Sequence, residues 1–301
     1  TDVPVSWTNY LGVEDLCAVV NHTAGGYLFY KSPEYHRITR FRPNGVPMDR
    51  PGHYVYLRDD DTGEFWTISW QPRGGDLKDY RCRHGLSYSV YECTRGGIDA
   101  SQTLFIPRGE NVELWDVKLE NKSNTRRNLS LYSYAEFSFH QIPIDNQNFQ
   151  MSLYCAGSDY ADGIIDYDLF YEHAHQYMAA SFAPDGFDCL RDTFLGPYRT
   201  ETDPIAVERG ACSGSFEKGG NHCAVLQKRL TLAPGETARL IWMLGEGDRE
   251  EGRCVRTKYS DPAAVDAAFR DLAEFWNEKL CKLQVHTPNA DMDTMLNTWT
   301  L

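Results

Sequence analysis

The alternation of apolar and polar residues along the chain predicts mostly β-strands. The longest such pattern covers residues 128–138, where small or apolar side chains occupy every second position and polar or tyrosine side chains lie between them. Because successive side chains of a strand point to opposite faces, this period of two predicts a long strand with one buried face. Pro143 follows. Proline has no N–H to give to a β-ladder, so strand pairing is expected to end there.

A polar, amide-rich loop is predicted directly after Pro143. Its residues are Asp145, Asn146, Gln147, Asn148, Phe149 and Gln150. All but Phe149 can form side-chain hydrogen bonds, and such a loop could present them to a ligand at the edge of a sheet. Most polar loops are simply solvated, however, so both interpretations stay open on the sequence alone.

Turn residues divide the remainder of the first 245 residues into short apolar runs. The pairs Gly25-Gly26, Gly96-Gly97 and Pro234-Gly235 each separate two such runs and predict three β-hairpins. Residues 186–204 form a long irregular excursion between strands, and its length indicates either a function or packing over a neighbour.

Helical periodicity begins at Ser260. Pro262 suits a first helical turn, and apolar residues recur at helical spacing from Val265 to Leu280. A second helix is predicted from Asn289 with the same spacing. A helix cannot bury an apolar stripe alone, so we expect the sequence to be the front part of a longer protein, cut where a helical domain begins.

Composition and charge narrow the function. The 301 residues are 42% hydrophobic, and the net charge is -13 with a pI near 5.1. The electric field of this negative charge repels phosphate groups, so we do not expect nucleic acids or anionic membranes as partners. Neutral substrates are compatible with it. No apolar run approaches the roughly 20 residues of a membrane span. The nine cysteines are scattered without a CxxC motif, so we expect reduced thiols and a cytoplasmic protein.

Two groups of residues suggest metal binding only weakly. A turn before Gly63 is the simpler interpretation of Asp59, Asp60 and Asp61. A calcium-binding loop would need ligands at alternating positions. His173 and His175 share one face of a predicted strand, but no third ligand is signalled, so hydrogen-bonded or solvated histidines are favoured. We therefore predict no metal site. No catalytic nucleophile, triad or carboxylate pair can be assembled from spacing either.

Several collinear motifs carry a family resemblance. They are NYLG (residues 9–12), NHTAGGY (21–27), RITRFRPNGVPMD (37–49), RHGLSY (83–88), YAEFSF (134–139), DNQNFQ (145–150), FLGPY (194–198), the PGE turn (234–236) and LNTW (296–299). In this order they resemble the amino-terminal part of the cellobiose and cellodextrin phosphorylases of glycoside hydrolase family 94.

The resemblance implies a mainly β fold in three parts. These are a large antiparallel β-sandwich (1–259), a helical linker (260–286) and the first helix of a truncated (α/α)6 barrel (287–301). It also implies cytoplasmic homodimers that cleave β-glucan oligosaccharides with inorganic phosphate as co-substrate and no other cofactor. The products would be α-glucose 1-phosphate, formed with inversion, and a shortened sugar. The catalytic Asp and the phosphate-binding side chains would lie in the missing barrel, so no catalytic residue is assigned here and this chain alone is expected to be inactive.

The resemblance also implies a role for the polar loop. In the cellobiose phosphorylases, the loop that matches residues 145–150 reaches over the partner subunit's active site, which makes Asp145, Asn148, Phe149, Gln150 and Met151 candidate substrate-binding residues. An Arg usually follows the Gln there, but Met151 stands in that place. Loss of this cation favours a longer cellodextrin or another acceptor. The alternative is a stand-alone carbohydrate-binding β-sandwich without catalysis.

Overall fold

Three antiparallel sheets make up the body of the molecule. The computed structural model describes residues 5–42, 49–75, 77–147, 151 and 154–299. The first sheet contains, in spatial order, β1 (Thr8–Leu11), β2 (Leu16–Asn21), β3 (Gly26–Tyr30), β4 (Arg37–Thr39) and β12 (Phe137–His140). The second contains β16 (Gly186–Leu190), β17 (His222–Leu232), β11 (Arg127–Tyr134), β5 (Tyr54–Asp59) and β6 (Phe65–Thr67). The third contains β13 (Ala156–Ala161), β14 (Ile164–Leu169), β15 (Ala174–Ala180), β18 (Thr237–Glu246), β10 (Val112–Asn121), β9 (Ile98–Phe105), β8 (Tyr88–Arg95) and β7 (Lys78–Gly85).

The main hydrophobic core lies between the eight-stranded sheet and the two five-stranded sheets. One continuous cluster of buried side chains includes Val20 from β2, Leu131 from β11, and Trp115 and Trp242 from β10 and β18. The indole N–H of Trp242 donates to the carbonyl of Leu226 in the opposite sheet, so even the polar atom of this ring is satisfied in the core. The predicted antiparallel β-sandwich is confirmed.

Two helices cover the outer face of the eight-stranded sheet. They are α4 (Arg249–Tyr259) and α5 (Pro262–Leu280), and they enclose a second apolar cluster that includes Leu114, Ile241 and Leu272. The prediction of a helix from Ser260 is confirmed, with Asp261 as its N-cap. Helix α4 is a finding that the pattern missed, because its sequence REEGRCVRTKY has too few apolar residues to show a stripe.

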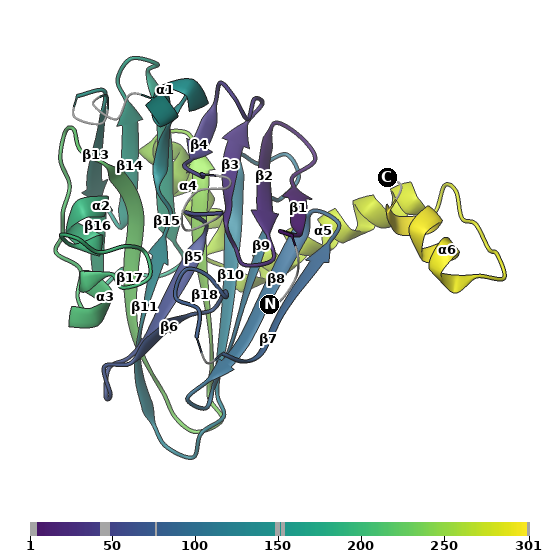
Figure 1. The fold of residues 1–301 in the computed structure, drawn as a ribbon, viewed down its shortest axis with the longest axis horizontal. Coiled ribbons are helices and arrows are strands. Elements are labelled where there is room, and N and C mark those ends of the chain that lie inside the picture. The colour runs from purple at the N-terminus through teal and green to yellow at the C-terminus, as the bar shows by residue number, and fades with distance from the viewer. Residues whose placement is uncertain (1–4, 43–48, 76, 148–150, 152–153, 300–301) are drawn as a thin grey trace.

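The carboxyl-terminal helices lie beyond the sandwich. Helix α5 runs past the edge of the sheets and carries α6 (Ala290–Thr294) and the π-helical turn η2 (Met295–Trp299) away from them (Figure 1). Asn289 caps α6 by accepting from two backbone N–H groups, as its place at the start of the second predicted helix requires. Met292 and Met295 are exposed. Within the described residues, no helix has the length and apolar character needed to cross a lipid bilayer.

The prediction of a single strand over residues 128–138 is wrong, because β11 and β12 are separate strands in different sheets. Strand β11 is buried on both faces, which also corrects the prediction of one buried face. Its second face is covered by α2 (Arg191–Leu195) of the long excursion, and α3 (Ile205–Arg209) follows directly after that excursion. The ring of Phe194 in α2 stacks on Tyr134 with centroids 5.3 Å apart and also contacts Tyr56 and Tyr132. The excursion therefore packs over β11. The tyrosines of the face that was expected to be exposed are buried.

Two of the three predicted hairpins are confirmed and one is wrong. Strands β2 and β3 pair across Gly25-Gly26, and β8 and β9 pair across Gly96-Gly97. Strands β17 and β18 flank the Pro234-Gly235 turn but lie in different sheets, β17 beside β11 and β18 beside β10. The turn therefore arches over the edge of the sandwich, and the two apolar faces meet across the core instead of lying side by side.

All nine cysteines are free. Burial raises the pKa of the Cys93 thiol to about 12 and that of Cys155 to about 11, so both thiols stay protonated near neutral pH. These cysteines behave as small apolar residues of the interior.

Candidate functional site

The segment after Pro143 begins with a helix where a loop was predicted. Residues Ile142–Gln147 form α1, which follows β12 at one end of the sandwich (Figure 1). Pro143 is the second residue of this helix, a position whose N–H needs no helical partner, so proline both ends the strand pairing and starts the helix. The candidate residues Asn148, Phe149 and Gln150 lie outside the described residues, and their contact with a substrate stays a prediction.

Asp145 is held by a buried arginine. Arg40 donates from Nε to Asp145 Oδ2 at 3.0 Å and from Nη2 to Oδ1 at 2.7 Å. The side chains of Arg40 and Asp145 are only 3% and 7% exposed. Paired N–H groups of this kind form a strong, directional contact with a carboxylate. Asp145 thus anchors α1 to the sandwich, and its contact with a sugar stays a prediction.

Arg40 belongs to a larger group that we call the arginine cluster, made of Arg40, Glu136, Asp145, Arg191 and Glu201. Glu136 is fully buried and accepts from Arg191 Nε at 2.8 Å, while Arg40 Nη1 lies 3.6 Å from its other oxygen. Arg191 Nη2 also donates to Glu201 at 3.1 Å. Burial alone would raise the pKa of Glu136, but Arg191 and Arg40 outweigh it and hold the pKa below its ordinary value.

Met151 packs inward. Its side chain is partly buried against the main core, and its carbonyl accepts from the backbone N–H groups of Tyr154 and Cys155. The structure therefore places two of the five candidate residues, Asp145 and Met151, as anchors on either side of residues 148–150. It does not bring their side chains together on an open surface.

A second polar group lies where β12 ends. We call it the histidine cluster, made of His36, His140, Glu172 and Glu246. The rings of His36 and His140 stack with centroids 3.9 Å apart, and His36 Nε2 lies 2.9 Å from Glu246 Oε1. His140 Nδ1 lies 3.2 Å from Glu172 Oε2. Burial, with a smaller contribution from His36, lowers the pKa of His140, which favours its neutral form.

The residues that the sequence singled out for metals have other partners. Asp59 pairs with Arg127, Asp60 with Arg58, and Asp61 with the side chain of Asn128, and the segment is a turn as predicted. His175 Nδ1 lies 3.1 Å from Asp166 Oδ1. His173 precedes β15 with a φ of 52°, so the prediction that it shares a strand face with His175 is wrong.

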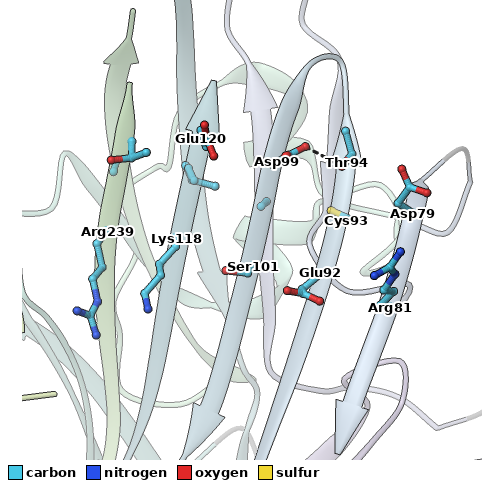
Figure 2. A pocket seen from close by; sticks show the side chains of 14 residues that line it. Asp79, Arg81, Glu92, Cys93, Thr94, Asp99, Ser101, Lys118, Glu120 and Arg239 are labelled. Carbon is cyan, nitrogen blue, oxygen red and sulfur yellow. Dashed lines mark hydrogen bonds between the residues drawn. The ribbon is translucent and has the colours of Figure 1, made fainter. Parts of the chain in front are cut away.

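A charged hollow of about 730 Å³ lies on the outer face of the eight-stranded sheet. Figure 2 shows Arg81, Glu92, Lys118 and Arg239 standing out from neighbouring strands on its floor. Arg239 donates twice to Asp116, at 2.8 and 2.9 Å, and to Asp266 of α5, so its charge is already used to hold the helix to the sheet. The hollow is an ion-paired, solvated face and carries no catalytic arrangement among its lining residues.

The fold and the matched sequence define the family. The family model for the glycosyl hydrolase 94 supersandwich domain matches residues 1–262, and this chain belongs to that family. The resemblance inferred from the motifs is confirmed.

Two curated relatives are N,N'-diacetylchitobiose phosphorylases, from Vibrio proteolyticus and Vibrio furnissii. They are 52% and 51% identical to this chain over all of its length. The solabiose phosphorylase of Paenibacillus borealis is 31% identical over 99% of the chain. The chain spans 38% of the length of each Vibrio protein and 40% of the Paenibacillus protein, so it corresponds to the amino-terminal part of these phosphorylases.

The fold recurs in a solved structure of distant sequence. A bacterial glucoamylase in complex with acarbose matches 92% of this chain and 39% of its own chain, with a TM-score of 0.56 at 9% identity. At this identity the likeness shows the fold alone.

Proposed function

We propose that this chain is the amino-terminal β-sandwich of an inverting phosphorylase that cleaves N,N'-diacetylchitobiose with inorganic phosphate. In this reaction a phosphate oxygen attacks the anomeric carbon, the glycosidic C–O bond breaks, and an acid donates its proton to the leaving oxygen. The products are N-acetylglucosamine 1-phosphate and N-acetylglucosamine. The acid and the phosphate-binding groups belong to the part of the protein that follows this chain.

The observation that carries the proposal is the 52% identity to the Vibrio proteolyticus enzyme over the whole chain. The motif resemblance led first to cellobiose and cellodextrins, and these sugars remain the competing substrates. Both possibilities share the reaction and differ in whether the sugar carries an N-acetyl group.

The sandwich contributes positioning in this proposal. Helix α1 is fixed at its base by Arg40 and Asp145, and the chain returns to the core at Met151. The chain between these two points would cover a partner subunit's active site in a homodimer. We also propose that the protein is cytoplasmic, because an oxidising compartment favours paired cysteines and all nine are free here.

The test is a phosphorolysis assay on the complete protein that contains this chain. N,N'-diacetylchitobiose, cellobiose and cellotetraose are each supplied with phosphate, and the sugar 1-phosphate is measured. We expect product from N,N'-diacetylchitobiose with the highest kcat/KM. A higher kcat/KM on either glucan would replace it as the substrate, and sugar binding without any sugar 1-phosphate would favour a carbohydrate-binding module.

The chain alone provides the second arm of the test. Because proton donation and phosphate binding both need the missing part, the isolated 301 residues should release no sugar 1-phosphate from any of these sugars. Release of sugar 1-phosphate by the isolated chain would refute the proposal that the catalytic groups lie outside it.

A further inference from the structure

Three potential metal ligands converge between two sheets of the sandwich. His36 immediately precedes β4, His140 ends β12, and Glu246 ends β18. One ring nitrogen of each histidine and one carboxylate oxygen of Glu246 all lie within 4.8 Å of one another. Two imidazoles and a carboxylate are a common ligand set for zinc.

The orientation of His140 fits a ligand. Its Nδ1 faces Glu172 at 3.2 Å, so the Nδ1–H donates to that carboxylate and the lone pair of the ring lies on Nε2, toward the cluster. A carboxylate that accepts from the far nitrogen of a histidine is the usual support of a metal-bound imidazole. Glu172 is held in turn by Gln141, which donates to its other oxygen at 3.1 Å.

The charges of this cluster are unbalanced. The side chains of Glu246 and Glu172 are 15% and 23% exposed, and within the described residues their ion-pair partners are His36 and His140. The carboxylates of the arginine cluster, in contrast, each face a permanent cation. A bound divalent cation would place a permanent positive charge beside these carboxylates.

Gln176 adds a fourth polar side chain to the cluster. It is fully buried, and its Nε2 lies 2.9 Å from His140 Nε2 and 3.0 Å from Glu246 Oε2. Its Oε1 has no hydrogen-bond partner among the described residues. Turning the terminal amide by half a rotation would exchange the two atoms and aim that oxygen into the cluster as a fourth donor.

From this geometry we infer that His36, His140 and Glu246 form a binding site for a divalent transition-metal ion of the zinc class, supported by Glu172 and Gln176. Zinc bonds of about 2.0–2.1 Å place tetrahedral ligands about 3.3 Å apart, so small side-chain movements inward from the present spacing would close the site. Calcium and magnesium prefer sets of oxygen ligands and fit less well. The ion would clamp β4 and β12 to β18 two residues before α1 begins.

The experiment is a metal titration of the tag-free chain after removal of metals by chelation. Zn²⁺ binding is followed by calorimetry and by the Tm, and Co²⁺ is used as a probe with visible absorption bands. We expect one ion per chain and a higher Tm. His36→Gln and Glu246→Gln should each weaken Zn²⁺ binding by more than 100-fold, and Glu172→Gln by about 10–100-fold. Among the three ligands, His36 is the best residue to replace, because its side chain is partly exposed and its replacement leaves the core intact.

His175→Gln is the matched control. This histidine lies on neighbouring β15 beside Asp166 and outside the cluster, so its variant should bind Zn²⁺ like the wild type. The inference is overturned if the wild type takes up no Zn²⁺, if His36→Gln binds with wild-type affinity, or if the Co²⁺ spectrum shows the thiolate charge-transfer bands of cysteine ligation. The readout needs no catalytic activity, so its outcome is independent of the proposed function.

Discussion

The two polar clusters near α1 balance their charges in different ways. In the arginine cluster, Glu136, Asp145 and Glu201 each face the guanidinium of Arg40 or Arg191, which keeps its charge at every physiological pH. In the histidine cluster, Glu172 and Glu246 face imidazoles, which carry no permanent charge. One cluster is therefore a permanent anchor, while the other can respond to its surroundings.

The two clusters act on the same short stretch of chain. The backbone N–H of Arg40 donates to the carbonyl of Glu136 at 2.8 Å, which places the arginine cluster at the start of β12. His140 ends β12 with a φ of 61°, an uncommon conformation for a residue with a side chain, and turns the chain toward α1. The position of α1 thus depends on both clusters.

Replacing Arg40 is the most severe way to break the permanent anchor. In Arg40→Met, buried Asp145 loses its paired cation and buried Glu136 keeps only Arg191, and we expect the free energy of unfolding to fall by about 3–5 kcal/mol. Urea denaturation of the chain measures this. Arg83→Met is the control, because its pair with Glu92 is exposed and should contribute less than about 1 kcal/mol. Equal losses in the two variants would show that burial does not distinguish these ion pairs.

His222 reports the influence of Arg40 through its pKa. Burial first, and the charge of Arg40 to a smaller extent, lower the pKa of this histidine to about 4. An unfolded histidine has a pKa of about 6.5, so the fold favours the neutral form. The neutral histidine therefore contributes up to about 3 kcal/mol to the free energy of unfolding. This contribution is fully present above about pH 6.5 and is lost as the pH falls toward 4.

The measurement is the free energy of unfolding against pH for the wild type and His222→Gln. Gln keeps a polar group beside Ser158, the present partner of His222 Nδ1 at 2.8 Å. We expect a shallower slope for the variant between pH 4 and 6.5. Identical slopes, or an NMR titration of His222 centred near 6.5, would contradict the assignment.

Local sequence patterns identified the strands but not how they join into sheets. The Pro234-Gly235 turn has the chemistry of a hairpin, yet its strands belong to different sheets, because a turn does not specify which edge the next strand joins. The alternating pattern predicts only one buried face for β11, because Ser130, Tyr132 and Tyr134 lie between the apolar positions. The excursion with Phe194, distant in sequence, covers that face, so the error came from tertiary packing.

The polar clusters were beyond the reach of a single sequence. Arg40 and Asp145 are 105 positions apart, and His36 and Glu246 are 210 apart, so no spacing rule connects them. One local sign existed. Glu136 is a charged residue inside a strand-like apolar run, and such a residue must find a buried partner.

Gln150→Ala separates the predicted role of the loop in substrate binding from the role of Asp145 in anchoring α1. If this loop touches the sugar, kcat/KM of the complete enzyme should fall by an amount equivalent to about 1–3 kcal/mol while the Tm stays unchanged. Asp145→Asn should lower both, because it weakens the contact with Arg40 that fixes α1.

Met151→Arg sharpens the same test. It introduces the cation that the resemblance to cellobiose phosphorylases implies after the Gln, so the preference should shift toward cellobiose over cellotetraose. If kcat/KM ratios among the three sugars of the assay stay the same in wild type, Gln150→Ala and Met151→Arg, the loop does not contact the substrate.

The smallest effect is expected in the charged hollow, where the same kinds of ions meet in water. Lys118 is 55% exposed and lies 3.5 Å from Asp116, which keeps both hydrogen bonds from Arg239 when the lysine is removed. Lys118→Met should therefore change the free energy of unfolding by less than about 0.5 kcal/mol, and added salt should reduce even this difference. Urea denaturation at low and high salt measures both. A loss above about 1 kcal/mol that persists in high salt would mean that the hollow is an organised ionic network, closer in kind to the arginine cluster than to an open surface.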